Sequence, residues 1–142
     1  MKVKFYIFTI LFIFLYNINL KADEILFDSG NLKIQNNGNT IYGKEVIAKI
    51  PSKKIEIEAD KSIYDKINSK LTLIDNVKVY DRNKNVYIES NNLIYDQVEN
   101  TIYSHGKTLI KVDDIYEINS KDMLYDRNLM RLSSKQDTII ED

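Results

Sequence analysis

The chain has 142 residues, of which 44% are hydrophobic, with 20 basic and 21 acidic side chains, one histidine and no cysteine. This length allows one domain, and the near-zero net charge excludes a polycation built to coat nucleic acid. The lack of cysteine excludes disulfide scaffolds, thiolate zinc sites and cysteine nucleophiles.

Residues 1–22 have the pattern of a secretory signal peptide. Lys2 and Lys4 precede a 12-residue apolar run from Phe5 to Tyr16, and a polar stretch leads to Ala22. A run of this length falls short of the roughly 20 residues that span a bilayer. We therefore predict an N-terminal signal helix, cleaved after Ala22, and one exported domain over residues 23–142. A leader that stays attached as a membrane anchor is the alternative.

The remainder predicts an all-β domain. It is rich in Ile, Val, Thr and Tyr, which fit a pleated sheet, and its only alanines are Ala48 and Ala59. Asn37-Gly38 is the strongest hairpin signal, since a type I′ turn needs positive φ at both central residues, and Pro51 marks a strand end. Apolar and polar residues then alternate, as in antiparallel strands with one dry face, over Ile55–Asp60, Leu71–Leu73, Val77–Val79, Val86–Glu89, Ile110–Asp113 and Tyr116–Asn119. Breaks in this alternation predict bulges at Asn91-Asn92 and Lys121-Asp122.

A Tyr-Asp pair recurs three times, at Tyr64-Asp65, Tyr95-Asp96 and Tyr125-Asp126, with spacings of 31 and 30 residues. Each pair follows an alternating stretch and precedes a turn and a second apolar stretch. Two strands per repeat favour a stacked, open jelly roll over a propeller, whose blades need four strands. We interpret each Asp as capping its turn through its own side chain and each Tyr as packing over the corner.

Candidate chemical sites give weaker patterns. Asp81-x-Asn83-x-Asn85 begins like a calcium loop but lacks the required Gly and Glu, so a polar turn is favoured. His105 has no nucleophile motif near it and is expected in a surface loop. The acidic residues of the Ile55–Asp60 stretch, Glu56, Glu58 and Asp60, are expected on the solvated face. We therefore predict no catalytic residue, no metal, no cofactor and no nucleic-acid partner, and a protein that is not an enzyme.

The repeats and several motifs resemble the OstA-like domain of the lipopolysaccharide-transport proteins LptA, LptC and the N-terminal part of LptD. The motifs are the opening Ala22–Ile25, the stretch Ile57–Lys61 and the stretch Asp75–Asp81, and the resemblance covers nearly all of residues 24–142. The turn Asp81–Asn85, which lacks the Gln-Gly of LptA-like members, and the terminal stretch Tyr125–Asp142 resemble LptD most.

This resemblance implies a twisted, open β-jelly-roll that binds lipid A acyl chains in an apolar groove and joins other Lpt jelly rolls edge to edge. It further implies a periplasmic location at the outer membrane and, for LptD, a partner barrel. The alternatives are a stand-alone LptA-like carrier, an LptC-like anchored adaptor, and a structural β-augmentation module without a lipid site. Alternation leaves open whether the apolar face forms a groove or only a solid core. The candidate lipid-binding residues are Ile55, Ile57, Leu71, Leu73, Val77, Val79, Val86, Ile88, Ile110 and Val112.

Overall fold

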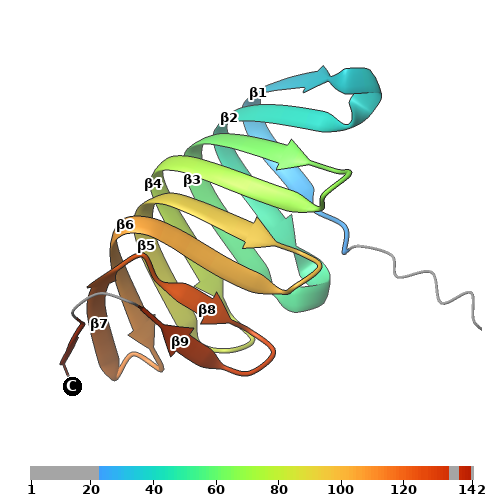
Figure 1. Cartoon of the computed structure of the whole chain (residues 1–142). Helices are drawn as coiled ribbons and strands as arrows, with labels where there is room; N and C mark the ends of the chain where they lie inside the picture. The colour runs from blue at the N-terminus through green and yellow to red at the C-terminus, as the bar shows by residue number, and fades with distance from the viewer. Residues whose placement is uncertain (1–22, 135–137, 142) are drawn as a thin grey trace, which may run out of the picture.

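The computed structural model describes residues 23–134 and 138–141, so the predicted signal helix and its cleavage after Ala22 lie outside the described residues. These residues form one antiparallel sheet in which the main strands follow one another as in the sequence (Figure 1). The strands are β1 (Leu26–Gln35), β2 (Thr40–Ile50), β3 (Ile55–Asp65), β4 (Lys70–Asp81), β5 (Val86–Asp96), β6 (Thr101–Val112), β7 (Tyr116–Lys121), β8 (Leu124–Asp126), β9 (Arg131–Ser133) and β10 (Ile139–Glu141). The predicted all-β class is confirmed.

The long strands bend midway, so each contributes to two layers of the molecule (Figure 1). Pairing shifts register between Glu58 and Lys61 on β3, between Ile74 and Val77 on β4, and between Ser90 and Asn92 on β5. An extra residue in one strand bends that strand and increases its twist. The register shifts at the predicted position Asn91-Asn92, but the extra residue lies on β6, where Gly106 and Lys107 stand against Asn91. The two stretches around Asp75-Asn76 are halves of the single strand β4. The line of these shifts across the sheet is called the bend.

The two layers are named from the view of Figure 1. The front layer holds the strand halves next to the turns 36–39, 66–69, 97–100 and 127–130, and the back layer holds the halves next to the turns 51–54, 82–85 and 113–115. The margin opposite the bend, where the turns of the two layers face each other, is called the mouth. Side chains pointing between the layers are called interior, and the others lie on the outer faces.

The turns confirm part of the sequence analysis. β2 ends at Ile50 and Pro51 begins a 3-10 turn, as predicted. Asn37 and Gly38 join β1 to β2 and both have positive φ, of 54° and 89°. The connection is a four-residue loop over residues 36–39, with a 3-10 segment at Asn36–Gly38, rather than a two-residue type I′ turn, because strand pairing ends at Gln35 and Thr40. Asn36 also has a positive φ, of 52°. Asparagine accommodates this left-handed backbone better than most residues.

Candidate binding site between the layers

The interior is a continuous apolar core shared by the long strands. The ten predicted lipid-binding residues all point into it: Ile57, Leu71, Leu73, Val77 and Val79 are 0% exposed, and Val112 packs against the core from its edge. Cross-strand pairs such as Ile57 with Val79 and Ile88 with Ile110 align these side chains in rows across the sheet. The alternation predicted this shared face, and their binding of lipid stays a prediction.

The layers are in contact in this structure. The void enclosed by Ile88, Ile102, Ile110 and Met123 has no room for a water molecule. The interior side chains of the two layers therefore pack against each other at this place, as in a protein core. A long apolar ligand would need the layers to separate, so the contacts that hold the mouth closed decide access.

The repeated Asp residues cap their turns, as the sequence analysis predicted. Asp65 accepts hydrogen bonds from the backbone N–H groups of Ile67 and Asn68, and Asp96 and Asp126 do the same two and three residues onward. The amide of Asn68 donates a further bond, of 2.7 Å, and holds the pKa of Asp65 below its usual value. These Asx-turns satisfy backbone groups at the front-layer side of the mouth.

The repeated Tyr residues point into the interior at the mouth rather than covering the corners. Tyr95 is 0% exposed and Tyr125 is 2% exposed, whereas Tyr64 is half-buried and stacks against Phe27 with ring centroids 5.8 Å apart. Leu71 lies between Tyr64 and Tyr95 in the register of the sheet, so the three side chains form one row across β3, β4 and β5. Each phenol places its ring in the core and its hydroxyl at the polar margin, a position suited to amphipathic rings. Burial raises the pKa of Tyr64 and, more strongly, that of Tyr125.

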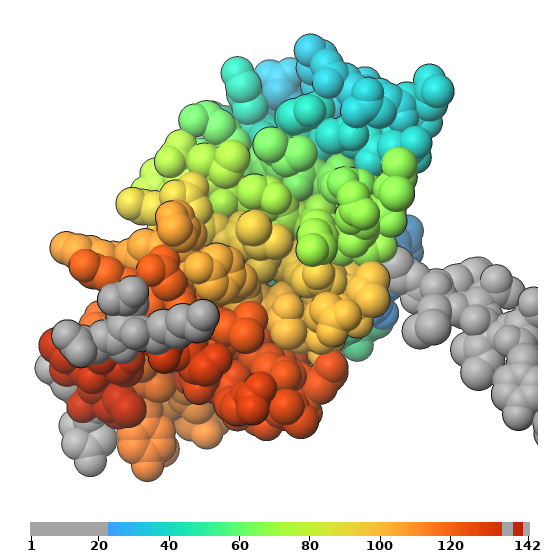
Figure 2. Space-filling view, viewed as in Figure 1, coloured from blue at the N-terminus to red at the C-terminus, as the bar shows by residue number. Residues whose placement is uncertain are grey.

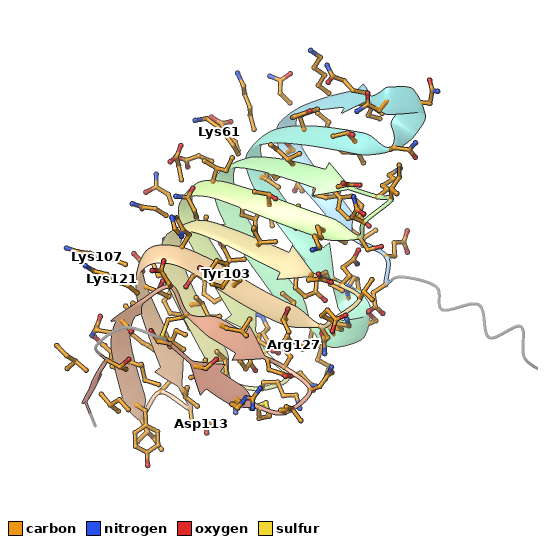
Figure 3. All side chains as sticks on the ribbon, in the orientation of Figure 1. Lys61, Tyr103, Lys107, Asp113, Lys121 and Arg127 are labelled. Carbon is orange, nitrogen blue, oxygen red and sulfur yellow. The ribbon has the colours of Figure 1, made fainter. Side chains whose placement is uncertain are left out.

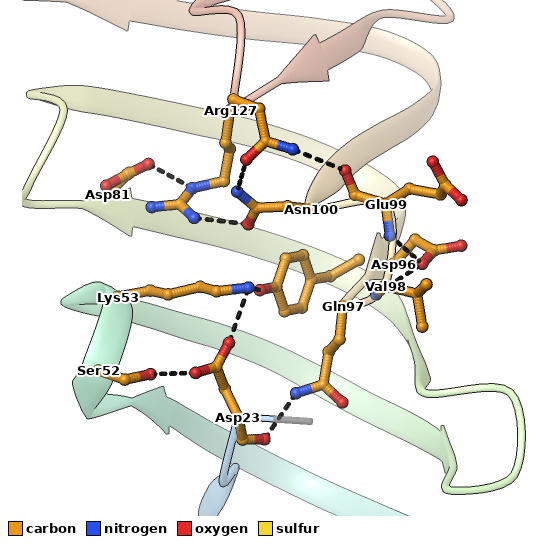
Figure 4. Close-up of polar contacts among 12 residues, drawn as sticks. Asp23, Ser52, Lys53, Asp81, Asp96, Gln97, Val98, Glu99, Asn100 and Arg127 are labelled. Carbon is orange, nitrogen blue, oxygen red and sulfur yellow. Dashed lines mark hydrogen bonds and ion pairs between the residues drawn. The ribbon is translucent and has the colours of Figure 1, made fainter. Parts of the chain in front are cut away.

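Asp23 forms a strap across the mouth (Figure 4). Its carboxylate pairs with Lys53 of the back layer at 2.8 Å and accepts a hydrogen bond from Ser52, and its carbonyl accepts one from Gln97 of the front layer. Lys53 also donates to the Tyr95 hydroxyl at 3.0 Å. The hydrogen bond from Lys53 lowers the pKa of Asp23. Burial of Lys53 favours its neutral form, but the bonds to Asp23 and Tyr95 outweigh this and raise its pKa.

A buried ion pair forms the second contact across the mouth (Figure 4). The Nε of Arg127 in the front layer lies 2.7 Å from the Oδ2 of Asp81 in the back layer, and the two side chains are 3% and 1% exposed. Arg127 also donates to the Asn100 Oδ1 at 2.7 Å. The other carboxylate oxygen of Asp81 has no hydrogen-bond partner among the described residues. An unpaired charge there would be costly, so each member of the pair depends on the other.

The sequence pattern does not predict this pair, because it places Asp81 in a polar turn. The available signal was the residue after each Tyr-Asp: Lys66 is exposed, whereas Gln97 and Arg127 are buried and reach across the mouth. The side chain at that position is exposed to solvent in the first repeat and buried at the mouth in the second and third. The repeat pattern alone suggested a uniform turn.

Buried hydroxyls line the interior side of the bend. Thr108 donates to the Ser104 Oγ at 2.7 Å, and Ser104 exchanges bonds with the backbone of Met123 across strands. Ser90 donates toward the carbonyl of Asn92 at its own bulge. Ser62, at the matching place on β3, is 2% exposed and its hydroxyl has no partner in the described residues. Small polar residues let the strands turn there while satisfying backbone groups freed by the bulges.

The remaining candidates lie on outer faces. His105 is exposed but sits on β6 at the bend, with its Nδ1 3.2 Å from an Asp122 oxygen, so the predicted surface loop is wrong in detail. Glu56 and Glu58 lie half-buried on the outer face of the back layer, where Glu56 pairs with Lys49 at 3.8 Å. Within residues 23–134 and 138–141 there is no cluster of three metal-binding side chains, and no helix there has the length and apolarity to cross a membrane.

The structure is similar to a solved structure, LptH of Pseudomonas aeruginosa, described as the LptA homologous periplasmic component of the conserved lipopolysaccharide transport device. The TM-score is 0.72 at 9% sequence identity, and the alignment covers 86% of this chain and 100% of LptH. No protein-family model and no curated protein sequence matches the chain. At this identity the likeness establishes the fold, an LptA-like β-jelly-roll, and so confirms the predicted architecture.

Proposed function

We propose that this protein is a periplasmic carrier module of lipopolysaccharide transport, which holds lipid A acyl chains between its two layers. The observation that carries the proposal is the continuous apolar interior, from Ala48 on β2 to Ile110 on β6, closed at the mouth by side-chain contacts. LptH, with the same fold, is described as a periplasmic component of such a device, which supports this location and cargo.

Loading requires the layers to move apart at the mouth while the strands stay continuous at the bend. Each methylene moved from water into the interior contributes about 0.8 kcal/mol, so a stretch of ten contributes about 8 kcal/mol. That gain offsets the loss of the Asp23 strap, of the Asp81–Arg127 pair and of part of the interior packing. The phenol hydroxyls of Tyr64, Tyr95 and Tyr125 would then face the boundary between acyl chains and polar head group.

Edge-to-edge assembly with other jelly-roll domains belongs to the same proposal. β1 is an edge strand of the sheet, and its interior-side residues Leu32 and Ile34 are 48% and 63% exposed. An unpaired edge offers backbone donors and acceptors to a partner strand, and a partner would extend the apolar interior past β1. A structural module that only pairs strands, without lipid of its own, is the competing function.

The position within the transport system is a finer proposal. A stand-alone LptA-like carrier fits the likeness to LptH, whose whole length the alignment covers. An LptD N-terminal-like domain beside an outer-membrane barrel and an LptC-like adaptor anchored by residues 1–22 are the alternatives. Detecting Asp23 as the first residue of the exported protein would exclude the anchored form.

Photo-crosslinking tests the proposal. A benzophenone amino acid replaces Ile57 or Leu73 in the interior, and Glu56 or Glu58 on the outer face provides the matched control, one residue from Ile57 on β3. We expect lipopolysaccharide adducts from the interior positions only. Adducts from Glu56 or Glu58 alone would contradict the proposal, and concentration-dependent oligomers that retain no lipid would favour the structural module.

A further inference from the structure

The outer face of the front layer carries an apolar row that the interior does not explain. Tyr42, Ile63, Thr72, Ile94, Tyr103 and Leu124 are consecutive partners across six strands, β2, β3, β4, β5, β6 and β8. Ile94 and Tyr103 are 39% and 38% exposed. The front layer faces the viewer in Figures 2 and 3, and Figure 3 shows Tyr103 on this face. On the outer face of the back layer the corresponding row has the ion pairs Lys49–Glu56 and Lys111–Glu117 at its two ends, and Tyr80 and Tyr87 lie between them with ring centroids 5.1 Å apart.

At its N-terminal end this row forms the floor of a groove. The groove has a volume of about 680 Å³ and lies over β1, β2, β3 and β4. Tyr42, Ile63 and Ile74 supply its apolar surface, and three lysines, Lys33, Lys44 and Lys61, surround it. A groove of this size is within the range of about 300–1,000 Å³ found for small-molecule sites.

The charged side chains that line the groove are all positive. Its lining includes three lysines and no carboxylate. Lys61 reaches Asp75 at 3.0 Å, whereas Lys33 and Lys44 have no ion pair in the described part of the chain. Lys44 and Lys61 are direct partners across β2 and β3, and like charges in that position destabilise a sheet unless an anion lies between them. Lys61 projects from the bend in Figure 3.

A second groove provides a comparison for the lysines and apolar floor of the first. It has a similar volume, about 670 Å³, and lies over the back layer with its own opposed lysines, Lys107 and Lys121. Its lining includes Glu89 and several asparagines, so it is more polar and its charge is partly balanced. Of these two grooves, the one over β1–β4 combines lysines with apolar side chains and has no carboxylate in its lining.

We propose that the groove over β1–β4 binds a single-chain anionic amphiphile, with its chain on Tyr42, Ile63 and Ile74 and its charged group between Lys33, Lys44 and Lys61. This outer site is separate from the interior site of the proposed function and goes beyond it. Charge complementarity selects an anion, and the apolar floor selects an anion that carries an acyl chain. A free anion would leave the apolar floor exposed to water.

The test is an NMR titration of the purified protein with dodecyl phosphate, with dodecyl maltoside and inorganic phosphate as separate arms. We expect saturable amide shifts at Tyr42, Ile63 and Ile74 with dodecyl phosphate, and no such shifts in the other two arms. The exposed double variant Lys33→Gln/Lys44→Gln should bind about tenfold more weakly, since charge-assisted hydrogen bonds are lost. The control Lys66→Gln, in an exposed turn of the same layer, should bind like the parent.

Several outcomes would overturn the proposal. They are equal binding by the double variant, equal binding of inorganic phosphate, groove shifts with the uncharged maltoside, and groove shifts that appear on concentrating the protein alone, which would assign the surface to a second copy. Shifts confined to interior residues such as Ile57 and Leu73 would also overturn the outer site while supporting the proposed carrier. The two proposals therefore fail independently.

Discussion

The two long margins of the jelly roll hold the layers together by different means. At the bend the strands themselves pass from one layer to the other, and buried hydroxyls such as Ser104 and Thr108 satisfy the backbone there. At the mouth the layers meet through the side-chain contacts of Asp23 with Lys53 and Gln97 and of Asp81 with Arg127. The bend therefore behaves as a hinge, and the mouth is the margin that can open without breaking strand pairing.

The buried pair at the mouth should give the largest effect. Arg127→Leu leaves the Asp81 carboxylate buried and without its partner, so we expect the free energy of unfolding to fall by about 3–5 kcal/mol in urea denaturation. The double variant Asp81→Leu/Arg127→Leu removes the charge as well and should recover most of that loss. A single variant as stable as the parent would mean that the pair does not hold the mouth.

The hydroxyls of the bend should give a smaller effect. Ser104→Ala leaves the buried N–H of Met123 without its side-chain acceptor, which costs about 1–3 kcal/mol. Urea denaturation gives the change, and hydrogen exchange at Met123 should rise with it. If hydrogen exchange rises at residues of the mouth instead, the bend and the mouth do not open independently of each other.

The loss of the Asp23 strap should be easier to detect as a change with pH than as a change in the free energy of unfolding. The folded pKa of Asp23 is lowered, so its stabilisation is present above the ordinary value of 3.8 and is lost as pH falls below it. The folded pKa of Lys53 is raised, so its contribution is present below 10.5 and is lost as pH rises beyond that value. The pair is partly exposed, and Lys53→Met should cost at most about 1 kcal/mol.

Distances between spin labels at Lys54→Cys and Val98→Cys, two exposed positions in turns of opposite layers, report on the strap, since the chain has no native cysteine. We expect the distance distribution to broaden below about pH 3.8, and Asp23→Asn to show the broad distribution at neutral pH. Asp65 and Asp96 also have lowered pKa values, so overall stability falls in the same acidic range. A pH response that Asp23→Asn leaves unchanged would assign the effect to those turns.

The smallest effect is expected at Ser62, the matched control for Ser104. Its hydroxyl is buried without a partner in the described residues, so Ser62→Ala removes a polar group that gains nothing in the fold. We expect the midpoint of urea denaturation to stay constant or rise. A loss as large as that of Ser104→Ala would show that every hydroxyl at the bend contributes equally.

The sequence predicted the interior well because alternation has a strict period of two. If Ile57 faces inward, the alternate residues of β3 face inward as well. The pairing of β3 with β4 then places Leu73 and Val79 on the same face. The Asp caps were also predictable, because an Asx-turn depends only on residues two and three positions away.

The contacts at the mouth could not be predicted in the same way. Asp81 and Arg127 are 46 residues apart and meet only because the strands bend, and Asp23 reaches Gln97 over 74 residues. The outer groove likewise depends on the register of four strands, which brings Lys44 opposite Lys61. Local sequence rules carry no information on these distances.

The most direct test of the account is to lock the mouth. Lys53→Cys and Gln97→Cys, whose parent side chains both contact Asp23 from opposite layers, are joined by a cleavable bis-maleimide linker, with a photo-probe at Ile57. Asn39→Cys and Lys66→Cys, on adjacent turns of the front layer, give a control that cannot lock the mouth. We predict that the lock abolishes lipopolysaccharide adducts at Ile57 and that cleaving the linker restores them. Equal adduct yields in the locked and cleaved protein would contradict entry through the mouth.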